Sequence, residues 1–202
     1  MPTYEYEAKR YDEGYTAVCG CDEAGRGPLC GPVVAAAVIL PIGLVIEGLN
    51  DSKKLSEKKR EALFEVIKKE AIAYAIAEAS PEEIDEYNIL NASMLAMRRA
   101  VEALPTPADF ALIDGNCSRG FTIPTETVVK GDAKSYSIAA ASILAKVTRD
   151  RQCEELDKLY PEYGIAKHKG YPTKDHMDAV RKHGPALIYR RSFLKFLDKD
   201  EP

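Results

Sequence analysis

The sequence lacks several features that define other classes of protein. Its 202 residues contain no apolar run near the ~20 residues that a membrane-spanning helix needs. They also contain no internal repeat, no low-complexity stretch and no Gly-x-x-x-x-Gly-Lys-Ser/Thr loop, which disfavours a P-loop nucleotidase. The acidic N-terminus has no signal-peptide apolar region. These absences predict a cytoplasmic protein without membrane association.

Cysteine and histidine are too sparse to define a site. The five cysteines are an odd number for a disulfide scheme, and the three within residues 19–30 do not have the usual spacing of a zinc site. We therefore expect buried, reduced thiols. His168, His176 and His183 have neither metal-ligand nor catalytic-triad spacing, and we expect them at the surface.

The net charge of −4 hides an uneven distribution. Residues 164–196 hold eight Lys or Arg against two acids, a local charge of +6, so the rest of the chain carries −10. A basic segment of this kind fits a surface that follows phosphates, and a solvated helical face fits it equally well. The distribution therefore allows a nucleic-acid partner, which the net charge alone argues against.

Short apolar runs alternate with helical patterns along the chain. The runs predict strands at 16–21, 33–40, 72–76, 110–113 and 127–129. Helices are predicted from 57 (burying Ala62, Leu63, Val66 and Ile67), over 81–103 with a break near Asn88, over 137–159 and over 174–183. Their N-caps are Ser56, Ser80 and Thr173. The pattern predicts an α/β domain over residues 1–163, with a basic helical C-terminal extension of the same domain over 164–202.

Residues 20–31 are the most informative stretch. Asp22 and Glu23 close an apolar run, Gly25, Arg26 and Gly27 follow, and a second apolar run begins after Gly31. Carboxylates at a strand end can hold a divalent cation, because hard cations prefer oxygen ligands. Glycines let the backbone approach a phosphate closely, and the arginine fork suits phosphate oxygens. The combination indicates phosphoryl chemistry.

Four carboxylates stand at the end of an apolar run or at a helix entrance: Asp22, Glu23, Asp114 and Asp132. Each alone is typical of a cap or turn, but strand-end acids without a histidine jointly suit Mg²⁺ or Mn²⁺. Neighbours on a strand point to opposite faces. Asp22 and Glu23 therefore share an ion only if the strand twists away at Asp22; otherwise Glu23 contributes less directly. We rank Asp22 and Asp114 first, then Glu23, then Asp132.

Seven motifs, in order, resemble those of the bacterial ribonuclease HII family. They are 20–27 (GCDEAGRG), 51–55 (DSKKL), 112–116 (LIDGN), 130–135 (KGDAKS), 140–150 (AASILAKVTRD), 168–171 (HKGY) and 190–193 (RRSF). The resemblance implies a ribonuclease H-like mixed sheet flanked by helices. It also implies a metal-dependent endoribonuclease that hydrolyses the RNA strand of RNA/DNA hybrids. Such an enzyme nicks duplex DNA 5′ of an embedded ribonucleotide, leaving a 3′-hydroxyl and a 5′-phosphate.

The resemblance also implies residue roles. It assigns catalysis and metal binding to Asp22, Glu23, Asp114 and Asp132, with Mg²⁺ or Mn²⁺ as cofactor. It assigns main-chain contacts that sense a 2′-hydroxyl to Gly25, Arg26 and Gly27, and contact with the sugar after the RNA–DNA junction to Tyr171. Tyr189 stands where the family has a histidine, which leaves the role of that position open.

Some assignments have alternatives. Lys53 and Lys54, in a turn before a helix, are expected to bind phosphate or to be ordinary solvated lysines, and Lys146 and Arg149 face either phosphate or solvent. The residues alone also allow a metal-dependent phosphohydrolase of small phosphorylated substrates, or a non-catalytic hybrid-binding module. We expect a monomer whose partners are RNA/DNA hybrids and duplex DNA containing ribonucleotides.

Overall fold

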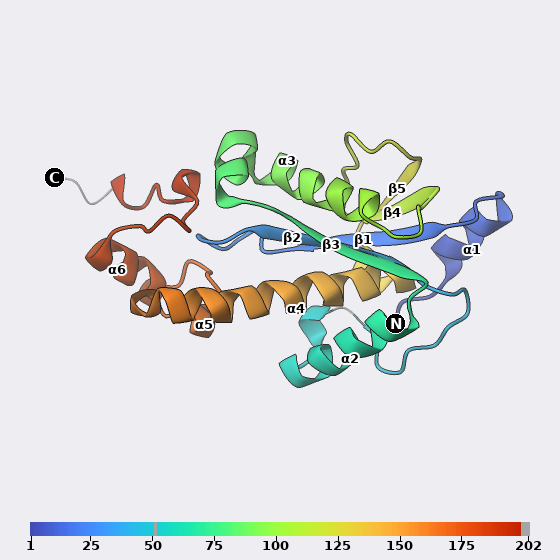
Figure 1. The fold of residues 1–202 in the computed structure, drawn as a ribbon, viewed down its shortest axis with the longest axis horizontal. Coiled ribbons are helices and arrows are strands. Elements are labelled where there is room, and N and C mark those ends of the chain that lie inside the picture. Colours follow the sequence, from blue (N-terminus) through green and yellow to red (C-terminus); the bar gives the residue numbers. More distant parts are fainter. Residues whose placement is uncertain (51, 199–202) are drawn as a thin grey trace.

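A five-stranded mixed sheet lies at the centre of the computed structural model, which describes residues 1–50 and 52–198 (Figure 1). Its strands are β1 (Val18–Ala24), β2 (Val33–Ile39), β3 (Ala73–Ala79), β4 (Phe110–Asp114) and β5 (Thr125–Val128). They lie in the order β3-β2-β1-β4-β5. β1 is antiparallel to β2 and parallel to β4, which is parallel to β5. The predicted mixed sheet is confirmed.

Helices cover both faces of this sheet (Figure 1). The helices of the described chain are α1 (Glu5–Asp12), α2 (Glu57–Glu70), α3 (Pro81–Glu102), α4 (Tyr136–Leu159), α5 (Ile165–His168) and α6 (Lys174–His183). Short 3-10 turns are η1 (Ser52–Lys54), η2 (Gly131–Ala133), η3 (Pro161–Tyr163) and η4 (Arg191–Phe193). Among the described residues, no helix has the length and apolar character needed to cross a membrane.

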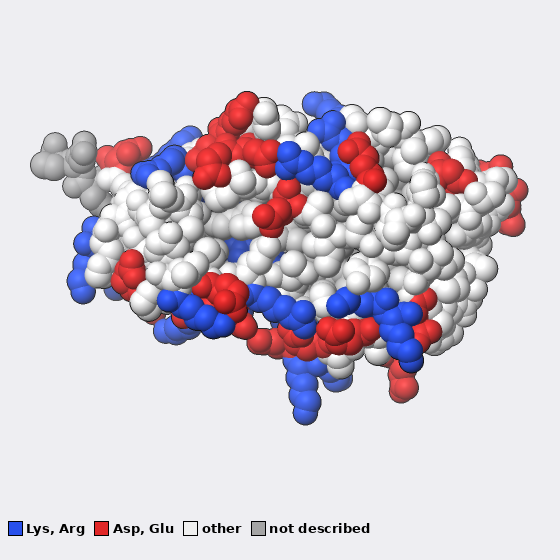
Figure 2. All heavy atoms as spheres, in the orientation of Figure 1, with Lys and Arg blue, Asp and Glu red and all other residues white. Residues whose placement is uncertain are grey.

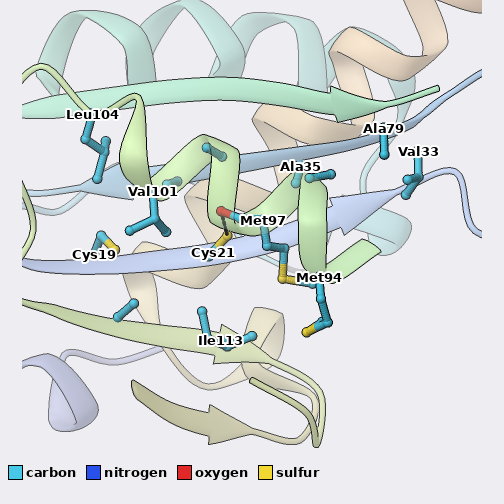
Figure 3. Close-up of a cluster of buried hydrophobic side chains, with 14 of the residues drawn as sticks. Cys19, Cys21, Val33, Ala35, Ala79, Met94, Met97, Val101, Leu104 and Ile113 are labelled. Atoms are coloured by element: carbon cyan, nitrogen blue, oxygen red, sulfur yellow. Dashed lines mark hydrogen bonds between the residues drawn. The ribbon is translucent and has the colours of Figure 1, made fainter. Parts of the chain in front are cut away.

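The face of the sheet against α3 buries alternate residues of β1 and β2. Cys19 and Cys21 pack with Val33, Ala35 and Met97 in one cluster (Figure 3). The Cys21 Sγ lies 3.8 Å from the Met97 carbonyl oxygen. The prediction of buried thiols holds for four of the five cysteines, since the fifth, at position 117, is only partly buried, and all five are free.

The opposite face carries α2 and α4. Ala36 and Val38, which alternate with the residues buried under α3, pack against Ala140 and Ile143 of α4. A Cβ added at Gly20 of β1 would lie only 2.2 Å from the carbonyl carbon of a residue in the first turn of α4. The glycine therefore lets the helix rest directly on the backbone of β1.

Element boundaries lie within a few residues of the predicted ones. Ser80 forms a capping box, and α3 is kinked at Asn88, whose φ is 68°. The predicted inner face of α2 is partly wrong, because Val66 is 41% exposed while Phe64 is buried. Ala62 is also exposed. The buried stripe of α2 runs one residue round from the predicted one, since helices α2 and α4 meet along the side that carries Phe64.

The N-terminal segment carries no motif but is fastened to α4. Glu7 of α1 is 1% exposed. Its Oε1 accepts hydrogen bonds from the Ser135 hydroxyl at 2.6 Å and from the Ser137 N–H at 2.9 Å. The carboxylate thus satisfies donors at the start of α4, as acids do at helix N-termini. It holds the segment directly after the turn that contains Asp132.

The expected surface position of the histidines is correct only for His183. His176 is fully buried, and its ring stacks on half-buried His168 with 4.1 Å between centroids. The Tyr171 carbonyl, 2.9 Å from the His176 Nδ1, can only accept, so Nδ1 donates and Nε2 accepts from the Tyr189 hydroxyl at 2.8 Å. Burial, with a smaller contribution from the charge of His168, lowers the pKa of His176 to about 4. The helix α6 pattern did not reveal this burial because the ring packs under a loop.

Charged side chains of both signs alternate along the lower edge of the face seen in Figure 2. Several basic residues of 164–196 also lie beside acids or are buried. Lys169 pairs with Glu154 at 3.1 Å and Lys167 with Asp175 at 3.2 Å, while Arg190 is fully buried. The positive balance of this segment therefore does not translate into a uniformly basic surface.

Candidate active site

Asp22 and Asp114 lie beside each other at one end of the sheet. β1 and β4 are parallel, with Cys21 opposite Ile113, so the next residues along both strands are again neighbours. By strand alternation, the side chains of both acids leave the sheet on the face opposite that of Cys21, where α4 packs. The carboxyl ends of two parallel strands thus bring together acids that are far apart in the sequence.

Asp22 and Glu23 line the same cavity, of about 190 Å³, although they are consecutive on a strand. Both stand at the open end of β1, where the chain turns at Gly25 with a φ of 94°. The Glu23 Oε1 lies 3.3 Å from the Arg26 Nη1. Both acids still pair regularly with β2, so the strand does not twist away at Asp22. The cavity nevertheless reaches both side chains, close to the point where β1 ends at Ala24.

Burial raises the pKa of Asp22 well above its usual range, and the negative charges of Glu23 and Asp114 raise it further. Hydrogen bonds from the Glu23 N–H, at 2.7 Å, and from the Ser142 hydroxyl oppose this shift. Burial also raises the pKa of Glu23, against the lowering effect of Arg26. The end of β1 therefore holds more negative charge than its surroundings neutralise, which favours a bound cation.

Asp132 is buried in the turn η2, and the residue before it is hydrogen-bonded to Asp114. The Gly131 N–H donates to Asp114 Oδ1 at 2.6 Å, which fastens the turn to the end of β4. Neither Asp114 nor Asp132 lines the cavity. Within residues 1–50 and 52–198, no group of three or more His, Cys, Asp or Glu side chains is placed to hold a metal ion. The oxygen donors suit Mg²⁺ or Mn²⁺ chemically, but they do not form a ready ligand set.

The predicted substrate-contact residues meet at the same cavity. Gly25, Arg26, Gly27 and Tyr171 all line it. A Cβ added at Gly27 would lie 3.1 Å from the Tyr171 ring, which is the reason a glycine fits there. Tyr171 is 46% exposed, so its ring is accessible from solvent.

The two lysines predicted to bind phosphate are less informative. Lys54 is exposed in η1 and does not line the cavity. The side chain of Lys53 lies outside the described part of the structure, as does Asp51 of the same motif. Lys54 is therefore not one of the residues that line the cavity with Asp22 and Glu23.

Helix α4 contributes a side of the cavity that sequence reasoning largely missed. Ser142, Lys146, Arg149 and Asp150 line the cavity. The Lys146 Nζ donates to Asp150 Oδ1 at 2.7 Å, and Arg149 is only 2% exposed. Their spacing places them on one side of a helix, a signal that was available once the helix was predicted. Two cavity residues from other segments, Ser52 and Lys169, were missed as well.

The mixed sheet and its strand-end carboxylates define a ribonuclease H-like hydrolase. A family model described as Ribonuclease HII matches residues 19–196. The chain therefore belongs to the ribonuclease HII family. It is an endoribonuclease that acts on RNA/DNA hybrids, as the resemblance implied.

Known proteins agree over most of the chain. Ribonuclease HII of Clostridioides difficile (strain 630) is 55% identical over 190 residues, which cover 94% of this chain and 74% of that protein. Ribonuclease HII of Vibrio vulnificus (strain YJ016) is 56% identical over 191 residues, covering 95% and 92%. Ribonuclease H2 from Pyrococcus horikoshii OT3 superposes with a TM-score of 0.74 at 29% identity, covering 91% of this chain and 98% of that structure.

A more distant structure shares the fold. Bst-RNase HIII in complex with Mn²⁺ superposes with a TM-score of 0.66 at 20% identity. The superposition covers 93% of this chain and 66% of that one. At this sequence identity, the superposition shows a shared fold and nothing more.

Proposed function

We propose that this chain also nicks duplex DNA on the 5′ side of an embedded ribonucleotide, leaving a 3′-hydroxyl and a 5′-phosphate. The observation that carries the proposal is the pairing of Asp22 with Asp114 at the ends of parallel strands, beside a cavity lined by residues 25–27 and Tyr171. An acidic centre next to an exposed run of backbone and an accessible aromatic ring suits a phosphodiester with its sugar.

We further propose that Asp22, Glu23, Asp114 and Asp132 hold Mg²⁺ or Mn²⁺. Support comes from the all-oxygen donor set and from the pKa of Asp22, which burial raises and which the neighbouring charges of Glu23 and Asp114 raise further. A divalent ion bound there would lower the pKa of water and offset charge that develops on the phosphate. The four carboxylates do not form a ready ligand group in the described part of the chain, so binding an ion would require side-chain movement.

Other side chains would bind and orient the nucleic acid. Main-chain groups of Gly25, Arg26 and Gly27 would contact the ribonucleotide, and Tyr171 would contact the following sugar. Lys146 and the predicted pair Lys53 and Lys54 would meet phosphates. A monomer would be sufficient, because one chain supplies every one of these groups. Residues 1–163 would form the catalytic domain, and residues 164–202 would be an extension of it.

The test is a labelled duplex with one ribonucleotide, incubated with Mg²⁺, Mn²⁺ or a chelator. We expect a single nick on the 5′ side of the ribonucleotide with either ion and none with the chelator. The matched control is the all-DNA duplex of identical sequence, which should stay intact. Cleavage of mononucleotides in preference to the duplex, or nicking of the all-DNA control, would contradict the proposal.

A further inference from the structure

Arg190 is fully buried and directs every N–H of its guanidinium at one loop, the segment 25–32 between β1 and β2. Its Nε donates to the Gly31 carbonyl at 2.9 Å; its Nη1 donates to Arg26 at 3.1 Å and Pro28 at 2.7 Å; its Nη2 donates to Gly25 at 2.6 Å and Pro32 at 3.1 Å. All five acceptors are main-chain carbonyl oxygens. Arg190 therefore determines which way several peptide planes of this loop face.

The main chain around Arg190 is also hydrogen-bonded to the main chain of the same loop. The Arg190 N–H donates to the Leu29 carbonyl at 2.9 Å, and the Gly31 N–H donates to the Ile188 carbonyl at 2.8 Å. Arg149 adds a further bond, from its Nη2 to the Cys30 carbonyl at 2.7 Å. The guanidinium is thus held at a defined position before any substrate binds.

Inward-facing carbonyls turn the next N–H groups outward. In a trans peptide the C=O and the following N–H point in opposite directions, and no peptide bond of the described chain is cis. Because the carbonyls of Gly25 and Arg26 point at Arg190, the N–H groups of Arg26 and Gly27 point away from it. Within the described residues neither N–H has a hydrogen-bond partner, and both residues line the cavity, whereas Arg190 does not.

We propose that Arg190 is a positioning residue that aims the Arg26 and Gly27 N–H groups into the cavity, and so creates the preference for a ribonucleotide. The inference rests on the proposed function, because it assumes that the loop meets the ribonucleotide. A pair of fixed N–H donors binds a hydroxyl or phosphate oxygen without first having to be ordered. Lysine cannot replace Arg190, since one ammonium has three donors and no planar fork.

The test compares Arg190→Lys with Arg191→Lys, both in an Asp22→Asn background that prevents turnover. Arg191 is the matched control because its side chain is exposed. Affinity is measured for two duplexes of one sequence, with and without a single ribonucleotide. We expect the ratio of the two affinities to fall about tenfold in Arg190→Lys, the size expected for one lost hydrogen bond of this kind, and to stay unchanged in Arg191→Lys.

The ratio of the two affinities shows whether Arg190 positions the loop or only stabilises the fold. A destabilised protein would bind both duplexes less well by the same factor, and the ratio would not move. An unchanged ratio in a folded Arg190→Lys protein overturns the inference. If the starting protein itself shows no preference for the ribonucleotide duplex, the proposed function fails instead, so the two failures are distinguishable.

A measurement on the natural chain covers the case in which Arg190→Lys does not fold. Hydrogen–deuterium exchange at Arg26 and Gly27 is compared with the two duplexes bound. We expect slower exchange at both amides with the ribonucleotide duplex than with the all-DNA duplex. Equal exchange with both duplexes would also overturn the inference.

Discussion

Carboxylates lie at both ends of the strand pair β1 and β4, but their surroundings shift the pKa in opposite directions at the two ends. At the amino ends, Asp109 accepts hydrogen bonds from the N–H and the hydroxyl of Thr16, both at 2.7 Å, and from the Ala17 N–H at 2.9 Å. At the carboxyl ends, Asp22 lies beside Asp114, and their like charges act on each other.

The pKa values follow this difference. Burial acts to raise the pKa of Asp109, but the hydrogen bonds from Thr16 and Ala17 outweigh it and lower that pKa overall. At the other end, burial and the neighbouring acids raise the pKa of Asp22 well above its usual range. The amino end of the strand pair, the structural end, therefore stabilises the fold. The carboxyl end, the proposed functional end, carries charge that its surroundings do not neutralise.

The largest expected effect is a loss of nicking activity when an acid at the functional end is replaced. Asp22→Asn should lower the rate of nicking by at least about 10³-fold, because it removes one of the two best-placed carboxylates. Binding of the ribonucleotide duplex should persist. Turnover per folded molecule and equilibrium binding are measured together, and Asp109→Asn, which should keep its turnover, is the control. Near-normal nicking by Asp22→Asn would remove this residue from the mechanism.

Metal addition should affect only the functional end. Saturating Mg²⁺ or Mn²⁺, at about 100 times its dissociation constant, should stabilise the folded protein by about 2.7 kcal/mol relative to chelator. Thermal melting reads this as a rise of several degrees. Asp109→Asn should keep the rise and Asp22→Asn should lose most of it. An equal rise in both variants would place the ion elsewhere.

At low pH, His176, which lies at neither strand end, should also affect the free energy of unfolding, and its contribution must be separated from theirs. The unfolded chain binds a proton at His176 below about pH 6.5, whereas the folded state keeps the ring neutral down to about pH 4. The stabilisation is present above pH 6.5 and is lost as the pH falls to 4, by about 3 kcal/mol. Urea unfolding from pH 7 to 4.5 should show this slope. His176→Gln should flatten the slope and His183→Gln, at an exposed position, should not.

The smallest expected effect concerns the structural end. Asp109→Asn should lower the free energy of unfolding by about 1 kcal/mol at pH 7, because a neutral amide accepts the hydrogen bonds from Thr16 and Ala17 less strongly. The lowered pKa means that this stabilisation is present above about pH 4 and is lost below it. In chelator, Asp22→Asn should change stability in the opposite direction. A loss of stability in both variants would contradict the comparison.

Much of the fold was predictable because its signals are local. The Ser80 cap, the Asn88 break and the strand ending at Asp114 were each read from a few adjacent residues. The inner face of α2 and the burial of His176 were misread. Both depend on what packs against the helix, and no local pattern reports that.

The site divides in the same way. The pairing of carboxylates with a glycine-rich turn pointed to Asp22 and Glu23, and a strand-end rule added Asp114. Two of the four cavity residues of α4 were considered, but only as facing either phosphate or solvent. The role of Arg190 was missed, although Arg190 lies in one of the seven motifs. A charged side chain counted toward a basic surface is, in the folded chain, surrounded by carbonyls of a loop about 160 positions away in the sequence.

By itself the sequence determined the class of the molecule: an α/β chain of the ribonuclease HII family, with acids at the ends of its apolar runs. Short-range spacing suffices for this, because strand alternation, helix caps and glycine turns act over a few residues. Only the tertiary structure decided that Asp22 meets Asp114, that Glu23 shares their end of the sheet, and that Arg190 faces the loop rather than solvent. These outcomes depend on strand register and on burial, which arise when distant segments exclude water together.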